Sequence, residues 1–312
     1  MKPYWQGVFP AVTTQMHRDG TIDLEATARH LEVLIDSGVG GLVMCGSLGE
    51  NQSLDPDEKR AVVEAAVGVA GGRVPVLGGV AETSTGAACR YVKDCRQLGA
   101  DGFMVMPAMA YRGDEREALG HLRAVAKATD APLMIYNNPI SYANDVTPPM
   151  FAKLAEIDTI VALKESSGDT RRMTDLRNVV GDRFALFTGV DDLVLESAVL
   201  GIDGWVAGIG LAFPYENQHL WDLIREGRWE QARALYGWYT PLLHLDVSTK
   251  LVQNIKLAMQ ETGLGSEWVR APRLQLVGAE RSRALGIIRR GIDERPKLPV
   301  KKATTSVRAR RG

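Results

Sequence analysis

The chain has 312 residues, of which 45% are hydrophobic and 24% are charged, as is usual for a soluble globular protein with a sizeable core. Its 37 Lys and Arg residues balance 38 Asp and Glu residues, and this net charge of -1 does not favour nucleic acid or a membrane as partner. No apolar run is long enough to span a bilayer, and the N-terminal segment lacks a secretory signal. We therefore expect a cytoplasmic protein. Its three cysteines fit neither a disulfide framework nor a zinc site.

Short apolar runs alternate with amphipathic segments over roughly the first 225 residues, which is within the usual size of an α/β barrel. The runs are continuously apolar, as expected for parallel strands that are buried on both faces. Most are separated by room for one helix, the rhythm of repeated strand–helix units. The predicted strands cover residues 7–12, 41–45, 74–79, 102–107, 132–137, 160–164, 184–189 and 204–209.

Helix start and stop signals agree with this pattern. Asp55-Pro56-Asp57-Glu58 combines an N-cap, a proline at the first helical position and a capping glutamate. Thr147-Pro148 offers a similar start, and glycines end a helix within residues 37–41, 98–102 and 200–204. These units predict a (β/α)8 TIM barrel rather than an open doubly wound sheet, and no GxGxxG motif follows the first strand.

Only helical patterns follow the last predicted strand. We assign residues 1–225 to the barrel and residues 226–295 to a C-terminal helical extension. Residues 296–312 are basic and poor in large apolar side chains, so we expect a disordered tail.

Lys164 closes the apolar run at 160–164 and is followed at once by residues that turn the chain. In a barrel of this type, active-site groups lie at the carboxyl ends of the strands. A partly desolvated lysine at that position loses its proton more easily and can attack a carbonyl to form a Schiff base. The alternative interpretation of this segment alone is a solvated lysine at the end of a strand.

Other strand ends carry groups that suit carbonyl chemistry. Tyr136, one strand away, can relay protons, although it could equally be an aromatic residue that closes the barrel. Ser47 and the amides of residues 47–49, which include Leu48 and Gly49, can form a small nest for a carboxylate. A tight strand–helix turn is the alternative for that segment. Their coincidence at the predicted barrel mouth favours the catalytic interpretation.

A metal-dependent aldolase would need histidines and carboxylates clustered at strand ends. Four of the five histidines fall in predicted helices, and only His17 lies near the predicted mouth. We therefore expect no catalytic metal and no cofactor.

Seven motifs, taken in order, resemble the dihydrodipicolinate synthase / N-acetylneuraminate lyase family of class I Schiff-base enzymes. The similarity runs from about Gly7 to Leu285. The motifs are GSLGE (46–50), LGADGFMVMPA (98–108), YNNP (136–139), LKES (163–166), TGVDD (188–192), LGIDGWVAG (200–208) and NIKLAMQETGL (254–264).

This resemblance implies a (β/α)8 barrel with C-terminal helices, a Schiff base between Lys164 and a small 2-oxo acid, and Tyr136 as proton relay. It also implies a homotetramer built as a dimer of dimers. The substrate is implied to contact four further positions: Ser47, the amide of Leu48, the carbonyl of Gly189, and Val206.

The chain departs from the family's synthases at three places. They usually read GTTGE, where this chain has Leu48 in place of the second threonine. They lend a tyrosine to the neighbouring subunit just after the strand-4 proline, whereas Ala108-Met109-Ala110 follows Pro107 here. They also carry an arginine after YNxP that binds the aldehyde substrate's carboxylate, where this chain has Ile140-Ser141-Tyr142. A serine hydroxyl does not replace that charge-assisted contact.

These departures predict an altered distal pocket formed by Glu82, Asn138, Ser141 and Tyr111. Such a pocket favours a hydroxylated 2-oxo acid or its cyclic imine, as in a 4-hydroxy-1-pyrroline-2-carboxylate deaminase or a dehydratase or aldolase of 2-keto-3-deoxy sugar acids. In both, an iminium at C2 lets the C3 proton leave before the C4 group is expelled. Two alternatives stay open: 4-hydroxy-tetrahydrodipicolinate synthase, which condenses pyruvate with aspartate semialdehyde, and a non-catalytic barrel that binds a sugar acid.

Overall fold

The computed structural model describes residues 5–108 and 111–299. Eight parallel strands form one sheet in the order β1-β8-β7-β6-β5-β4-β3-β2. The ring closes between the two ends of this order, because Val12 donates to the carbonyl of Val43 at 2.9 Å and Val43 donates to that of Pro10 at 3.0 Å. The predicted barrel is confirmed. Its strands are β1 (Gly7–Val8), β2 (Leu42–Met44), β3 (Val76–Val80), β4 (Gly102–Val105), β5 (Leu133–Asn137), β6 (Ile160–Glu165), β7 (Ala185–Thr188) and β8 (Gly204–Trp205).

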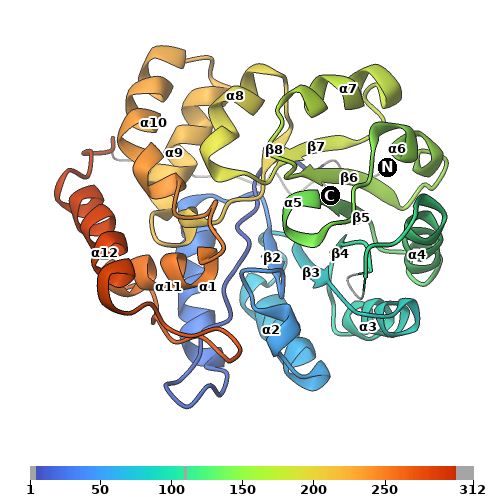
Figure 1. Cartoon of the computed structure of the whole chain (residues 1–312), viewed down its shortest axis with the longest axis horizontal. Coiled ribbons are helices and arrows are strands. Elements are labelled where there is room, and N and C mark those ends of the chain that lie inside the picture. Colours follow the sequence, from blue (N-terminus) through green and yellow to red (C-terminus); the bar gives the residue numbers. More distant parts are fainter. Residues whose placement is uncertain (1–4, 109–110, 300–312) are drawn as a thin grey trace, which may run out of the picture.

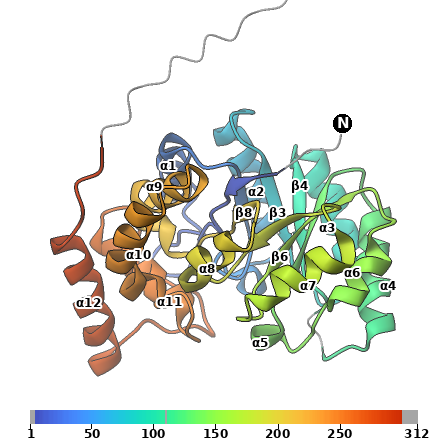
Figure 2. The same ribbon diagram turned by 90° about the horizontal axis from the view of Figure 1, so that it is seen from above.

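Helices surround the strands, and α10, α11 and α12 lie together on one side of the barrel (Figure 1). Figure 2 shows α12 on the outside of this group, farthest from the strands. In the described part of the chain, no helix is long and apolar enough to cross a membrane. The α-helices are α1 (Leu24–Ser37), α2 (Pro56–Ala70), α3 (Thr85–Gln97), α4 (Glu115–Lys127), α5 (Pro139–Tyr142), α6 (Pro148–Leu154), α7 (Arg171–Val180), α8 (Val194–Val199), α9 (Pro214–Arg225), α10 (Trp229–Leu243), α11 (Leu251–Glu261) and α12 (Gly278–Asp293).

The helix signals in the sequence have the expected local structure. α2 begins with a capping box, in which the Asp55 amide donates to the Glu58 carboxylate at 2.9 Å. Each predicted glycine stop contains a residue with left-handed backbone: Gly38 (φ 98°), Gly99 (φ 97°) and Gly201 (φ 79°). This conformation costs glycine little and turns the chain from the helix toward the next strand. The predicted disordered tail falls mostly on residues 300–312, outside the described residues.

Aromatic side chains fill the end of the barrel where the strands begin. The rings of Phe9 and Phe187 meet edge to face, with centroids 5.2 Å apart. Two glycines make room for them: a Cβ on Gly41 would lie 2.3 Å from the Phe9 ring, and one on Gly204 would lie 2.1 Å from the Phe187 ring. This end of the barrel is therefore closed by packing, which leaves the carboxyl ends of the strands for a pocket.

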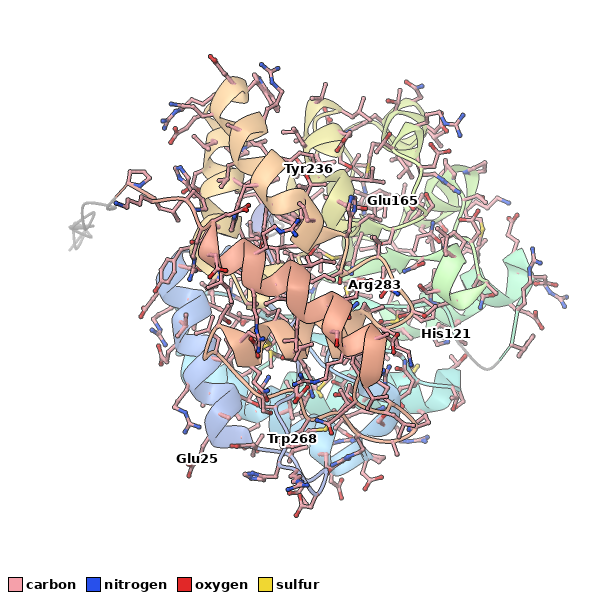
Figure 3. All side chains as sticks on the ribbon, turned by 60° about the vertical axis from the view of Figure 1, so that its left-hand side comes forward. Glu25, His121, Glu165, Tyr236, Trp268 and Arg283 are labelled. Atoms are coloured by element: carbon pink, nitrogen blue, oxygen red, sulfur yellow. The ribbon has the colours of Figure 1, made fainter. Side chains whose placement is uncertain are left out.

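A buried ion pair joins the C-terminal extension to the loop after β2. Lys256 of α11 donates to Glu50 at 2.6 Å and to the carbonyl of Trp268, marked in Figure 3, at 2.7 Å. Both side chains of the ion pair are inaccessible to solvent. The second carboxylate oxygen of Glu50 accepts from the Arg270 amide at 3.0 Å. The extension and the GSLGE loop are thus held by charged groups with no access to water.

We expect Lys256→Met to lower the free energy of unfolding by about 3–5 kcal/mol, because it removes the cation that the buried Glu50 carboxylate contacts at 2.6 Å. Urea unfolding followed by circular dichroism measures this change. Glu261→Gln, which breaks the more exposed pair with Arg289, is the matched control and should change stability little. Equal effects of the two substitutions would contradict the importance of the buried pair.

Candidate active site

A cavity of about 710 Å³ opens at the carboxyl ends of the strands. Its wall is built by strand ends, by the loops that follow them and by the segment between α10 and α11. Eight of the nine predicted site residues line this cavity: Ser47, Leu48, Tyr136, Asn138, Ser141, Lys164, Gly189 and Val206.

Three positions singled out from the sequence do not line the cavity. The backbone of Gly49 instead lies close to that of Cys45, since a Cβ added to Gly49 would be 2.9 Å from the Cα of Cys45. Glu82 is turned toward Lys59, which donates to it at 2.7 Å. Tyr111 is 61% exposed and donates to Glu117 at 2.7 Å. The expected distal pocket therefore lacks Glu82 and Tyr111. The first side chain is hydrogen-bonded to Lys59 and the second to Glu117.

Lys164 lies near the end of β6 with only 6% of its surface exposed. It pairs in register with Tyr136 of β5, and its Nζ lies 4.0 Å from the centroid of the Tyr136 ring. Burial lowers the pKa of Lys164 below its ordinary value of 10.5, and the charge of Asp246 is the largest influence in the opposite direction. The amine is therefore neutral at lower pH than that of a solvated lysine.

Gly189, directly after β7, leaves the space that Lys164 occupies. A Cβ at this position would lie 2.1 Å from Cε of Lys164 and 2.2 Å from Oγ of Ser166. The Ser166 hydroxyl is itself buried, lines the cavity and has no hydrogen-bond partner among the described residues. Any side chain larger than hydrogen at position 189 must move the lysine.

Tyr142 joins the site although the sequence analysis noted it only as part of a segment without arginine. Its hydroxyl is hydrogen-bonded to Ser47, and its ring meets that of Tyr136 edge to face with centroids 6.0 Å apart. Asn138 donates to the Tyr136 hydroxyl at 3.0 Å. The three side chains Tyr136, Tyr142 and Ser47 therefore link β5 to the loop after β2 within one chain.

The signal for Tyr142 was present in the sequence. Asn138-Pro139 is a cap-plus-proline start, and the Asn138 side chain accepts from the Ser141 amide at 3.0 Å. The resulting single turn, α5, lies in front of the strand ends in Figure 1 and turns Tyr142 back toward Tyr136. Predicting a helical turn after Asn138, instead of an extended loop, would have indicated that Tyr142 lies close to Tyr136.

Two carboxylates follow β7: Asp191, which is buried, and Asp192, which lines the cavity. Asp191 accepts hydrogen bonds from the Trp205 indole at 2.9 Å and from the Ile209 amide at 2.7 Å, and it also accepts from the Gly208 amide. Burial raises the pKa of Asp191 from 3.8 to about 6. Asp192 accepts from Nδ1 of His244 at 2.7 Å when that nitrogen is protonated. Within residues 5–108 and 111–299, no cluster of His, Cys, Asp and Glu side chains could hold a metal ion.

Residues 4–289 match the Dihydrodipicolinate synthetase family. The chain belongs to this family. It is 30% identical over 288 residues to the 4-hydroxy-tetrahydrodipicolinate synthase of Pelobacter propionicus, covering 91% of this chain and 98% of that protein. It is 31% identical over 271 residues to the synthase of Methanospirillum hungatei, covering 86% and 93%.

Solved structures agree with this assignment. Dihydrodipicolinate synthase from Aquifex aeolicus superposes with a TM-score of 0.87 at 27% identity, covering 91% of this chain and 97% of that one. The chloride-inhibited synthase from Acinetobacter baumannii, complexed with pyruvate, gives 0.87 at 26% identity, covering 92% and 99%. Members of the family are class I lyases, and this chain is an enzyme of that class.

The buried lysine yields a prediction about pH. Competitive acetylation followed by mass spectrometry should give Lys164 a pKa below 10.5, with the exposed Lys127 as reference in the same digest. Reaction of Lys164 at no lower pH than Lys127 would contradict the desolvation argument.

Proposed function

We propose that Lys164 forms a Schiff base with a small 2-oxo acid. The observation that carries this proposal is the buried amine of Lys164 in the cavity, 4.0 Å from the Tyr136 ring centroid. The neutral amine attacks the C2 carbonyl, and the resulting carbinolamine loses water to give an imine that withdraws electrons from C3. The pyruvate complex of the A. baumannii relative supports a 2-oxo acid as the ligand.

In this mechanism Ser47 and the amide of Leu48 hold the substrate carboxylate, while Tyr136 and Tyr142 move protons. Loss of water from the carbinolamine needs a proton on the departing oxygen, and a phenol can supply it. Burial raises the pKa of both tyrosines above 10.0, so each keeps its proton at neutral pH. The Tyr142 hydroxyl is hydrogen-bonded to Ser47 of the same chain, so one of these phenols lies beside the proposed carboxylate site without a second subunit.

The second half of the proposal concerns the substrate. We infer a hydroxylated 2-oxo acid or its cyclic imine, processed by a 4-hydroxy-1-pyrroline-2-carboxylate deaminase or a 2-keto-3-deoxy sugar acid dehydratase or aldolase. Asn138 and Ser141 line the cavity and can hydrogen-bond to hydroxyl groups. The carboxylate of Asp192 on the same cavity can accept further hydrogen bonds.

One observation favours the alternative, condensation of pyruvate with aspartate semialdehyde. Arg273 lines the cavity from the segment after α11, although no arginine follows Pro139. Its Nη1 donates to Ser53 at 3.1 Å and lies 3.9 Å from Glu50. A guanidinium therefore stands at the cavity wall, and the curated relatives described above are synthases.

The homotetramer and the cytoplasmic location stay predictions.

Borohydride trapping tests the Schiff base directly. Wild-type protein reduced with pyruvate should gain one adduct on Lys164, and Lys164→Ala should gain none. Gly189→Ala should trap on the order of 100-fold more slowly, because its methyl group displaces the lysine side chain. Gly237→Ala, where nothing lies within 4 Å of the added carbon, is the matched control. An adduct at another lysine, or none, would refute the mechanism.

Turnover assays distinguish the two substrate classes. We expect consumption of 4-hydroxy-1-pyrroline-2-carboxylate or 2-keto-3-deoxyarabonate, and little condensation of aspartate semialdehyde with pyruvate. The physical reason is that Ser141 stands where the synthases carry their carboxylate-binding arginine. Activity with the last pair alone would show that Arg273 replaces that arginine.

A further inference from the structure

One carboxylate in the cavity has no role in the mechanism above. Asp246 lies in the segment between α10 and α11, within the C-terminal extension, and lines the same cavity as Lys164. Its carboxylate rests on the backbone after β8, since a Cβ on Gly208 would lie 2.3 Å from its Oδ1. The extension thus brings an acidic group to the mouth of the barrel.

Asp246 differs from the nearby acids Asp191 and Asp192 in having no hydrogen-bond donor. Asp191 accepts three N–H groups, and Asp192 faces the imidazole of His244. Across residues 5–108 and 111–299, no amide or side chain donates to the Asp246 carboxylate. A partly buried carboxylate without donors is poorly stabilised as an anion, and it has an unused site for a ligand.

The charges around Asp246 favour its protonated form. Burial raises the pKa of Asp246 well above 3.8, and the negative charges of Asp191 and Asp192 raise it further, whereas Lys164 lowers it. When Lys164 is uncharged, it no longer lowers the pKa of Asp246, and the effects of burial and of Asp191 and Asp192 remain. Asp246 can therefore hold a proton at the pH where the amine is reactive.

We propose that Asp246 is the acid that protonates the oxygen leaving C4 of a substrate held as an imine on Lys164. This step rests on the proposed function. Tyr136, as the phenolate left after carbinolamine collapse, takes the proton from C3. The electron pair of that C–H bond first forms the C2–C3 double bond of an enamine on Lys164. When the nitrogen lone pair re-forms the iminium at C2, this pair moves to make the C3–C4 double bond and the C4–O bond breaks. The oxygen departs as water with the proton from Asp246, which becomes a carboxylate and is later reprotonated from solvent.

The other polar groups of the cavity suit this step less well. Asp192 already faces the imidazole of His244 at 2.7 Å. Arg273 carries a guanidinium that does not give up a proton in the working pH range. Asp246 combines access to the cavity with a free carboxyl oxygen, so elimination at C4 is assigned to it.

The test separates imine chemistry from elimination. Exchange of the methyl protons of pyruvate in D2O, followed by NMR, needs the imine and proton removal at C3 but no leaving group. Elimination is measured with 2-keto-3-deoxyarabonate and 4-hydroxy-1-pyrroline-2-carboxylate. Asp246→Asn, of nearly unchanged size, should keep borohydride trapping and exchange close to wild type and lose elimination on the order of 100-fold.

Three comparisons make the outcome decisive. Glu261→Gln should leave both activities unchanged, and Tyr142→Phe should slow exchange and elimination together. Asp246→Ala should repeat the result of Asp246→Asn, with circular dichroism verifying the fold of each variant. These matched results would support a role limited to the leaving group.

Elimination by Asp246→Asn at the wild-type rate would overturn the proposal. So would loss of trapping, exchange and elimination together in a folded variant, because Asp246 would then act on Lys164 instead of on the leaving group. Wild-type protein that exchanges pyruvate protons but consumes neither 4-oxygenated compound would overturn the role of Asp246 alone. Absence of trapping in the wild type would refute the proposed function as well.

Discussion

The site depends on keeping the amine of Lys164 out of water. Desolvation disfavours the ammonium form and thereby makes a nucleophile of a residue that is ordinarily charged. The barrel achieves this with local means: the end of β6 is buried, the Tyr136 ring covers the amine, and Gly189 leaves space for the side chain. In the proposed mechanism the neighbouring groups act on the substrate only after this amine has captured it, so their placement follows from that of the lysine.

The two ends of the barrel have different tasks. At the end where the strands begin, Phe9 and Phe187 close the interior by packing. At the opposite end, the C-terminal extension completes the site. The buried pair of Glu50 and Lys256 fixes the loop that carries Ser47, and the segment between α10 and α11 supplies Asp246. The extension is therefore a stabilising element and also part of the cavity wall.

The sequence predicted the parts of the site that follow from local periodicity. A continuous apolar run ending in Lys164, next to one ending at Tyr136, places both at the same edge, because parallel strands share their direction. Tyr142 was not predicted as a site residue because its position depends on a single helical turn, which reverses the chain. Asp246 and Arg273 were missed because they come from distant segments, and only tertiary packing brings such residues to the strand ends.

Charge is distributed unevenly around the cavity, and this bears on the substrate. Arg273 contacts Ser53 and Glu50 beside the GSLGE loop, whereas Asp192 follows β7 and Asp246 precedes α11. Glu50 also faces Lys256, so one carboxylate serves two cations there. A substrate with its carboxylate toward Ser47 and its C4 oxygen toward the acids would align with this asymmetry. Under the proposed function, the reverse orientation would bring the substrate carboxylate toward Asp192, so the charges favour the orientation in which C2 meets Lys164 while C4 meets an acid.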